Sequence, residues 1–177
     1  MRILGVTASS ILKVTSSYES IASATGTGSS GTITFSSIPS TYKHLQIRGT
    51  SYDGTGYSVR MRFNNDSGSN YAWHRITGTG ASATAGAATS NTDMVIINTN
   101  GNVDSQPASL IIDIHDYAST TKYKTSRTFD GLGQNDTGGE VELRSGLWMS
   151  TSAITRIDIL TNGSFTNLTR LALYGIK

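Results

Sequence analysis

Short runs in which apolar and polar residues alternate follow one another along the chain. Val59, Met61 and Phe63 alternate with polar or basic neighbours, and a period of two places such apolar residues on one face of a β-strand. The same alternation occurs at 44–48 and 140–144. Further apolar runs predict strands at 33–35, 71–76, 94–98, 110–115, 123–129, 154–160 and 168–176.

Clusters of Gly, Asn and Asp separate these runs. Asp53-Gly54 and Asn162-Gly163 are two examples, and such residues tolerate the positive φ angles of tight turns. Gly and β-branched residues interrupt every candidate helical stripe. The pattern therefore predicts an all-β protein, a jelly-roll-like antiparallel β-sandwich. Its predicted core comes from the apolar phase of the alternating runs: Leu45, Ile47, Val59, Met61, Phe63, Val141, Leu143, Ile157, Ile159 and Leu173.

Two segments do not follow this pattern. Residues 77–91 are nearly all Gly, Ala, Ser and Thr, which indicates either a loop or a flat, closely approached strand. Residues 1–17 are too short and weakly patterned to fold alone, so we expect an N-terminal arm followed by one β-sandwich domain over 18–177. The apolar residues of the arm are its predicted partner-binding residues: Ile3, Leu4, Val6, Ile11 and Leu12. The alternative is that the arm completes the domain's own sheet.

The composition narrows the classes of function. Hydrophobic residues make up 36% of the chain, and the formal net charge is only +2, so a folded chain is expected. The basic residues are scattered, which does not favour nucleic-acid binding. No apolar run approaches the roughly 20 residues that span a bilayer, and the N-terminus does not resemble a signal peptide. The chain has no cysteine, which is compatible with assembly in a reducing cytoplasm.

The most chemically suggestive residues do not form a convincing site. Asp113, His115 and Asp116 carry metal-binding and general-base groups, but in a strand Asp116 points away from the other two. The oxygen-rich segment 64–70 lacks the spacing of an EF-hand, which favours a hairpin loop. No serine-hydrolase elbow and no phosphate loop occurs in the sequence. We therefore expect a non-enzymatic protein without a metal or cofactor.

Aromatic residues offer a different kind of site. Aromatic rings can stack on sugars, and a glycan-binding face would use such side chains. Trp148 lies beside Leu147, which favours a place in the core. The aromatic candidates for glycan binding are Trp73, Trp148, Tyr52, Tyr57, Tyr71 and Tyr123.

Several long, aperiodic segments are specific enough to compare with known families: Tyr18–Ala22, Phe35–Gly49, Arg62–Asp66, Asp116–Ala118, Lys122–Lys124, Ser145–Trp148 and Ala172–Ile176. Through these segments, most of the chain resembles a family of small, β-rich virion proteins of tailed phages, common among phages of cyanobacteria and other aquatic bacteria. The family brings no catalytic motif.

The resemblance implies a structural role in a virion. The first expectation is a capsid cement or decoration protein on the outer capsid surface, which binds across major-capsid subunits and stabilises the shell. The alternative is a tail-fibre or host-recognition β-sandwich module that binds surface glycan, and a carbohydrate-active enzyme is a weaker third. Virion proteins of this kind commonly form symmetric oligomers, and a trimer is favoured over a dimer.

Overall fold

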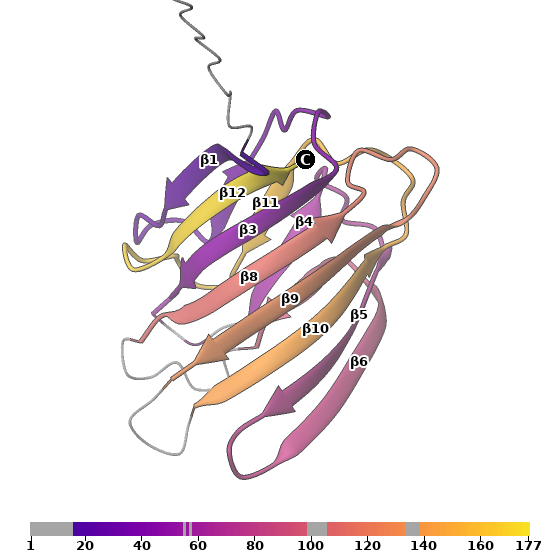
Figure 1. Cartoon of the computed structure of the whole chain (residues 1–177). Helices are drawn as coiled ribbons and strands as arrows, with labels where there is room; N and C mark the ends of the chain where they lie inside the picture. The colour runs from indigo at the N-terminus through magenta and orange to yellow at the C-terminus, as the bar shows by residue number, and fades with distance from the viewer. Residues whose placement is uncertain (1–15, 55, 57, 99–105, 134–138) are drawn as a thin grey trace, which may run out of the picture.

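The computed structural model describes residues 16–54, 56, 58–98, 106–133 and 139–177. In this part of the chain, strands form two antiparallel sheets that pack as a sandwich (Figure 1). The larger sheet has the order β1 (Tyr18–Thr25), β12 (Arg170–Ile176), β3 (His44–Ser51), β8 (Ala108–His115), β9 (Lys124–Leu132), β10 (Glu140–Trp148), β5 (Tyr71–Gly78) and β6 (Ala83–Asn91). The smaller sheet has the order β2 (Thr32–Phe35), β11 (Ile157–Leu160), β4 (Val59–Phe63) and β7 (Met94–Ile97).

The two sheets differ in width. In Figure 1, β4 and β11 of the smaller sheet pass behind β12, β3 and β8. The edge strand β7 contacts β10 and β5. These arrangements confirm the predicted all-β sandwich, whereas eight strands against four do not by themselves identify a jelly roll.

Eight of the ten predicted core residues lie between the sheets, each at most 2% exposed: Leu45, Ile47, Val59, Met61, Phe63, Ile157, Ile159 and Leu173. The alternation in β3, β4, β11 and β12 therefore identified their inner faces correctly. Aromatic rings complete the centre of this core. The ring of Phe63 lies 5.5 Å from that of Trp148, and Tyr71 stacks on Trp148 at 6.4 Å.

The prediction for β10 was wrong. Val141 and Leu143 are 46% and 47% exposed, while Glu142 and Arg144 are buried. Trp148, at the end of the same strand, points inward, and its indole Nε1 donates a hydrogen bond to Asp66 Oδ2 at 2.7 Å. Because alternate residues share a face, an inward Trp148 requires the even-numbered residues of β10 to point inward as well.

A second feature of β10 supports the same orientation. Gly146 faces the smaller sheet, and a Cβ atom at this position would lie on Met94 Sδ. Any larger residue would therefore collide with β7. The inward face of β10 thus meets the smaller sheet through a glycine and an aromatic ring.

The segment 64–70 is not the predicted hairpin loop. It follows β4 of the smaller sheet and leads into β5 of the larger one, so it connects the two layers. Asn64 and Asn65 have φ angles of 51° and 58°, which Asn adopts more readily than most residues. The Asn64 side chain accepts hydrogen bonds from the backbone of Thr155 and Arg156. These bonds hold the connection between the two sheets in place.

The sequence pattern did not clearly predict two of the strands, β1 and β6. β1 forms one edge of the larger sheet, and β6, in the Gly- and Ala-rich segment, forms the other. Of the two interpretations of residues 77–91, a strand is correct for 83–91, whereas 79–82 form the loop that joins β5 to β6. Small residues such as Ala and Gly have low β-propensity, and β6 is held by its pairing with β5.

We predict that Phe63→Ala lowers the free energy of unfolding by about 3 to 5 kcal/mol, because it removes a buried ring that packs against both Tyr71 and Trp148. Phe129→Ala is the matched control, since Phe129 is 54% exposed. Urea titrations of both variants would give the two values. Equal losses would show that Phe63 is not part of a packed core.

Candidate interaction surface

The outer face of the larger sheet carries a row of large apolar side chains. Leu143 of β10 lies opposite Phe129 of β9 and Ile76 of β5, and Phe129 lies opposite Ile111 of β8. These four side chains are between 38% and 61% exposed. We call Ile76, Ile111, Phe129 and Leu143 the apolar row.

The apolar row is continuous because its members are register partners. Side chains directly opposite one another on neighbouring strands have Cβ atoms roughly 5 Å apart. Val141 lies two residues from Leu143 on the same face and is also exposed. Together these five side chains present roughly 400 Å² of apolar surface, which is in the range of the largest patch on a typical monomer.

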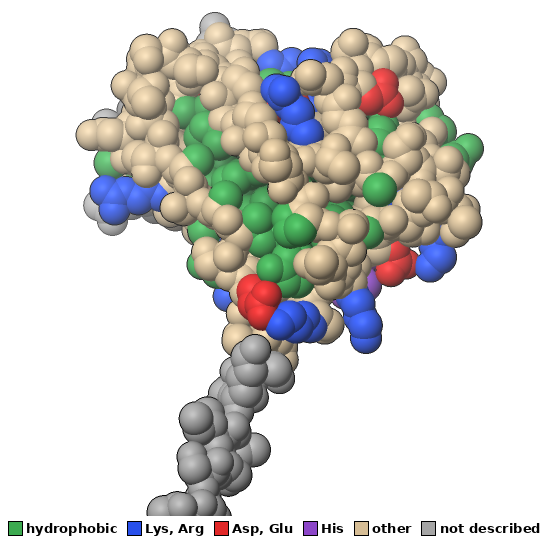
Figure 2. Space-filling model, turned by 90° about the horizontal axis from the view of Figure 1, so that it is seen from above, with side chains coloured by type: hydrophobic (Ala, Val, Ile, Leu, Met, Phe, Trp, Pro, Cys, Tyr) green, Lys and Arg blue, Asp and Glu red, His purple; other side chains and the backbone are tan. Residues whose placement is uncertain are grey.

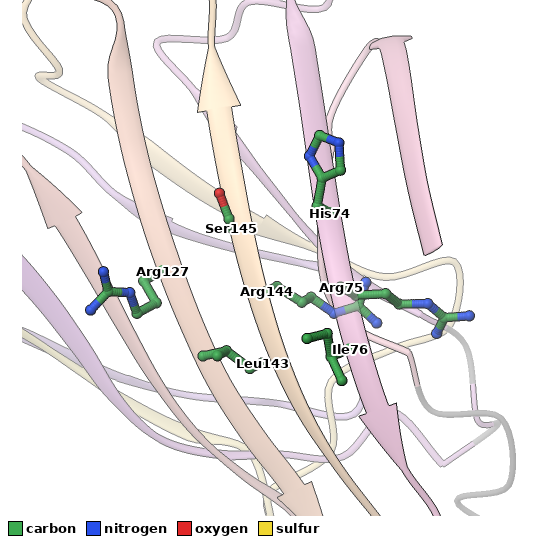
Figure 3. Close-up of a pocket in the computed structure, with 7 residues that line it drawn as sticks. All are labelled: His74, Arg75, Ile76, Arg127, Leu143, Arg144 and Ser145. Carbon is green, nitrogen blue, oxygen red and sulfur yellow. The ribbon is translucent and has the colours of Figure 1, made fainter. Parts of the chain in front are cut away.

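A shallow pocket of about 190 Å³ lies at one end of the apolar row. Figure 3 shows Ile76 and His74 on β5, with Leu143 and Ser145 on the neighbouring β10 and Arg127 beyond them on β9. The pocket thus has an apolar floor and polar groups to one side. It could receive an apolar side chain of a partner protein, but it is small for a metabolite.

The charged groups beside the apolar row are mainly basic. Arg127 is two residues from Phe129 on the same face of β9, and it lies opposite Asp113 of β8 and Ser145 of β10. Arg48 lies opposite Ile111 at the other end, where its guanidinium packs over the ring of Tyr18 at 5.3 Å. Asp113 also accepts a hydrogen bond from Gln46. A partner with an apolar patch bordered by carboxylates would therefore fit this face best.

The inner face of β5, β9 and β10 carries buried or half-buried charged side chains. Glu142 accepts a hydrogen bond from Arg75 Nη1 at 2.9 Å and others from Arg144 and Thr77. The guanidinium of Arg144 also packs over the ring of Trp73 at 5.4 Å. Two cations thus share one buried carboxylate, and removing Glu142 would leave the buried guanidinium of Arg144 without its counter-ion.

Asp130 belongs to the same buried cluster. It lies opposite Glu142, is 2% exposed, and its Oδ1 has no hydrogen-bond partner among the described residues. Burial, and then the negative charge of Glu142, raise the pKa of Asp130 to about 8, although Arg144 acts in the opposite direction. Asp130 therefore keeps its proton at neutral pH.

The Asp113, His115 and Asp116 group does not converge on one point. Asp116 begins a turn with a φ of 49° and pairs with Lys122 at 2.8 Å. The ring of His115 lies edge-on to that of His44 at 5.2 Å. Within the described ranges, no three His, Asp or Glu side chains lie close enough to hold a metal ion.

The aromatic candidates do not share one face either. Trp148 and Tyr71 are buried in the core, whereas Tyr123 is exposed in the segment before β9. Trp73 lies on the inner face against Arg144. Tyr52 is half-buried, and Tyr57 lies outside the described residues.

Some predictions fall on residues that the structure does not describe. The arm residues Ile3, Leu4, Val6, Ile11 and Leu12 all lie outside the described residues. In the part of the chain that is described, no helix is long and apolar enough to cross a membrane. Viewed from above, the Lys and Arg side chains lie in several separate groups, so this face has no continuous basic track (Figure 2).

A scan against protein-family models and searches of curated proteins and solved structures find no match for this chain. The apolar row was not recognised from the sequence, because its members were assigned to the core or given no face. One signal was available. Trp148 and Leu143 are separated by an odd number of positions in one strand, so their side chains point to opposite faces and could not both be buried.

We predict that Asp130→Asn stabilises the protein increasingly as the pH rises from about 4 to about 8. The unfolded chain releases this proton near pH 4, whereas the folded chain keeps it until about pH 8. The free energy of unfolding of the unmodified protein therefore falls across this window, on the order of a few kcal/mol in total. Asn does not titrate, so the variant does not show this loss.

Denaturant titrations at several pH values would measure this difference. Asp116→Asn is the control, because Lys122 holds the pKa of Asp116 below its ordinary value and the carboxyl titrates below this window. Parallel stability curves for Asp130→Asn and the unmodified protein would contradict the buried, protonated state.

Proposed function

We propose that this chain is a structural protein of a tailed-phage particle, and that it binds the major capsid protein as a cement or decoration protein. The observation that carries the proposal is the apolar row on the outer face of the larger sheet. The largest apolar patch on a monomer is often functional, and a polar border around it is a feature of protein-binding surfaces. The sequence resemblance supplies the virion context.

The shape of the site suits binding between protein surfaces. The apolar row lies across four neighbouring strands of a sheet whose other face is packed or hydrogen-bonded. Its side chains are therefore presented on a rigid support, which lowers the entropic cost of association. A cement protein stabilises a shell through many such contacts, each of modest strength, that add up over the particle.

The apolar row supplies only part of a stable interface. A standard protein interface buries about 800 Å² on each partner, and the apolar row with Val141 presents roughly half of that. Basic groups beside it, Arg48 and Arg127, could pair with carboxylates of the capsid. We propose that the N-terminal arm contributes the remaining contacts.

A test of this proposal compares two exposed aromatic residues. Phe129 belongs to the apolar row and is 54% exposed, whereas Tyr123 lies outside it and is 55% exposed. We predict that Phe129→Ser weakens binding to expanded empty capsids of the same phage by about tenfold or more, the effect of losing at least 1.4 kcal/mol. Tyr123→Ser should leave this binding unchanged.

Co-sedimentation with empty capsids measures this binding. A parallel experiment measures whether the protein binds to host cells. Binding to host cells but not to capsids would contradict the cement role and favour the glycan-binding tail module. Equal capsid binding by Phe129→Ser and the unmodified protein would show that the apolar row is not part of the interface.

We further predict that deletion of residues 1–14 weakens capsid attachment while leaving the domain folded. The apolar side chains of Ile3, Leu4, Val6, Ile11 and Leu12 would contribute about 25 cal/mol for each Å² they bury, less the entropy of ordering the arm. Thermal melting and co-sedimentation decide the outcome. Unchanged attachment with a much lower melting temperature would mean that the arm is part of the domain.

A further inference from the structure

The outer edge of β6 is an unpaired strand edge. β6 is the last strand of the larger sheet, and among the described strands it pairs with β5 alone. Along such an edge, alternate residues direct their backbone N–H and C=O groups away from the sheet. Another β-strand can satisfy this ladder of donors and acceptors along its whole length.

The other described edges have features that discourage pairing, whereas β6 lacks most of them. β1 contains a bulge between Ser20 and Ala22, and its Glu19 pairs with Lys177. β2 and β7, at the edges of the smaller sheet, have only four residues each. β6 has nine residues and contains no charged residue and no proline. Natural proteins usually protect a long edge strand with such devices unless it binds something.

The regular part of β6 spans Ala83–Ala88, before an irregularity in which Ser90 has a φ of 57°. Its register with β5 places Ala83, Ala85 and Ala87 on the outer face of the sheet, level with Gly78, Ile76 and His74. Ala85 therefore lies in line with the apolar row. No large side chain on β6 would obstruct a strand that approaches its edge.

From this edge we infer that two copies of the chain pair through β6, antiparallel and across a two-fold axis at Ala85. Ala85 then faces Ala85 of the second copy, while Ala83 faces Ala87 and Thr84 faces Gly86. The two larger sheets become one continuous sheet. A two-fold strand pair closes as a dimer, in contrast to the trimer favoured from the sequence.

The position of the apolar row favours a second copy over an unrelated strand. With Ala85 on the axis, the apolar row of one copy continues directly into that of the other, so that a single band crosses both molecules. A band of twice the length gives a partner two equivalent contacts. The strand pairing does not depend on the proposed capsid role, because it uses the edge of the sheet and not its face.

The dimer should be weak in solution. Pairing six residues of each edge buries less than the roughly 1,200 Å² of a standard interface. A covalent trap is therefore the most direct measurement. The chain contains no cysteine, so a single introduced thiol can form a disulfide only between two molecules.

The decisive comparison is between Ala85→Cys and Ala87→Cys. Facing residues in an antiparallel pair have Cα atoms about 4.5 to 5.5 Å apart, which a disulfide can bridge. Residue 87 and its own symmetry mate are four positions apart along the strand, or about 13 Å, which is too far. Under mild oxidation we expect Ala85→Cys to form mostly covalent dimer and Ala87→Cys to remain mostly monomeric.

A mixture of Ala83→Cys and Ala87→Cys should give a covalent heterodimer, because these positions face each other across the axis. Failure of Ala85→Cys to cross-link, or equal cross-linking of Ala85→Cys and Ala87→Cys, would overturn the proposed pairing.

A charged substitution tests the pairing without a covalent bond. Ala85→Lys places a charge on the axis, and the matched control Thr25→Lys places one on the exposed opposite edge, β1. In sedimentation measurements at increasing concentration, we expect the unmodified protein and Thr25→Lys to dimerise and Ala85→Lys to stay monomeric with an unchanged melting temperature.

Dimerisation of Ala85→Lys at the same concentrations as the unmodified protein would overturn the inference. The sedimentation and cross-linking results do not depend on capsid binding, so they test the dimer separately from the proposed function.

Discussion

The inward position of Trp148 is the constraint on which the polarity of this sheet depends. Its indole stacks on Tyr71, packs near Phe63, and donates to Asp66. Burial disfavours the charged form of Asp66, but hydrogen bonds from Trp148, Asn70 and Gly68 outweigh this and lower its pKa. Since side chains alternate along a strand, one anchored tryptophan determines the face of every residue back to Glu140. The burial of Arg144 and the exposure of Leu143 both follow.

This orientation exchanges the usual roles of the two faces. In the middle of β9 and β10, charged and hydroxyl side chains point into the protein, while Phe129, Val141 and Leu143 point to solvent. The buried ions carry a desolvation cost, which the hydrogen bonds of Glu142 to Arg75 and Arg144 offset in part. A chain optimised only for the stability of an isolated domain would place Leu143 inside. The observed arrangement is understandable if the outer face is covered in an assembly.

The sequence predicted the sandwich well where one face of a strand is plainly apolar and the other plainly charged. β4 is such a case, because Met61 and Phe63 alternate with arginines. The same reasoning failed for β10, where Val141 and Leu143 alternate with Glu142 and Arg144 just as clearly. Local alternation reveals that two faces differ but not which one is covered. That choice came from packing at Trp148 and Gly146, which involves residues of β4, β5 and β7 that are distant in sequence.

At Gly146 the two sheets approach so closely that the side chain of Met94 fills the space that a Cβ atom would need. A methionine is flexible, but its sulfur here occupies the space of the missing Cβ, so neither position can change alone without a collision or a void. The two positions should consequently change together. A Cβ atom at 146 would also lie 2.5 Å from Ser126 Oγ, so in related chains a side chain at 146 should occur only with a shorter residue at 94 and a smaller one at 126. Covariation of these alignment positions would report how closely the two layers approach.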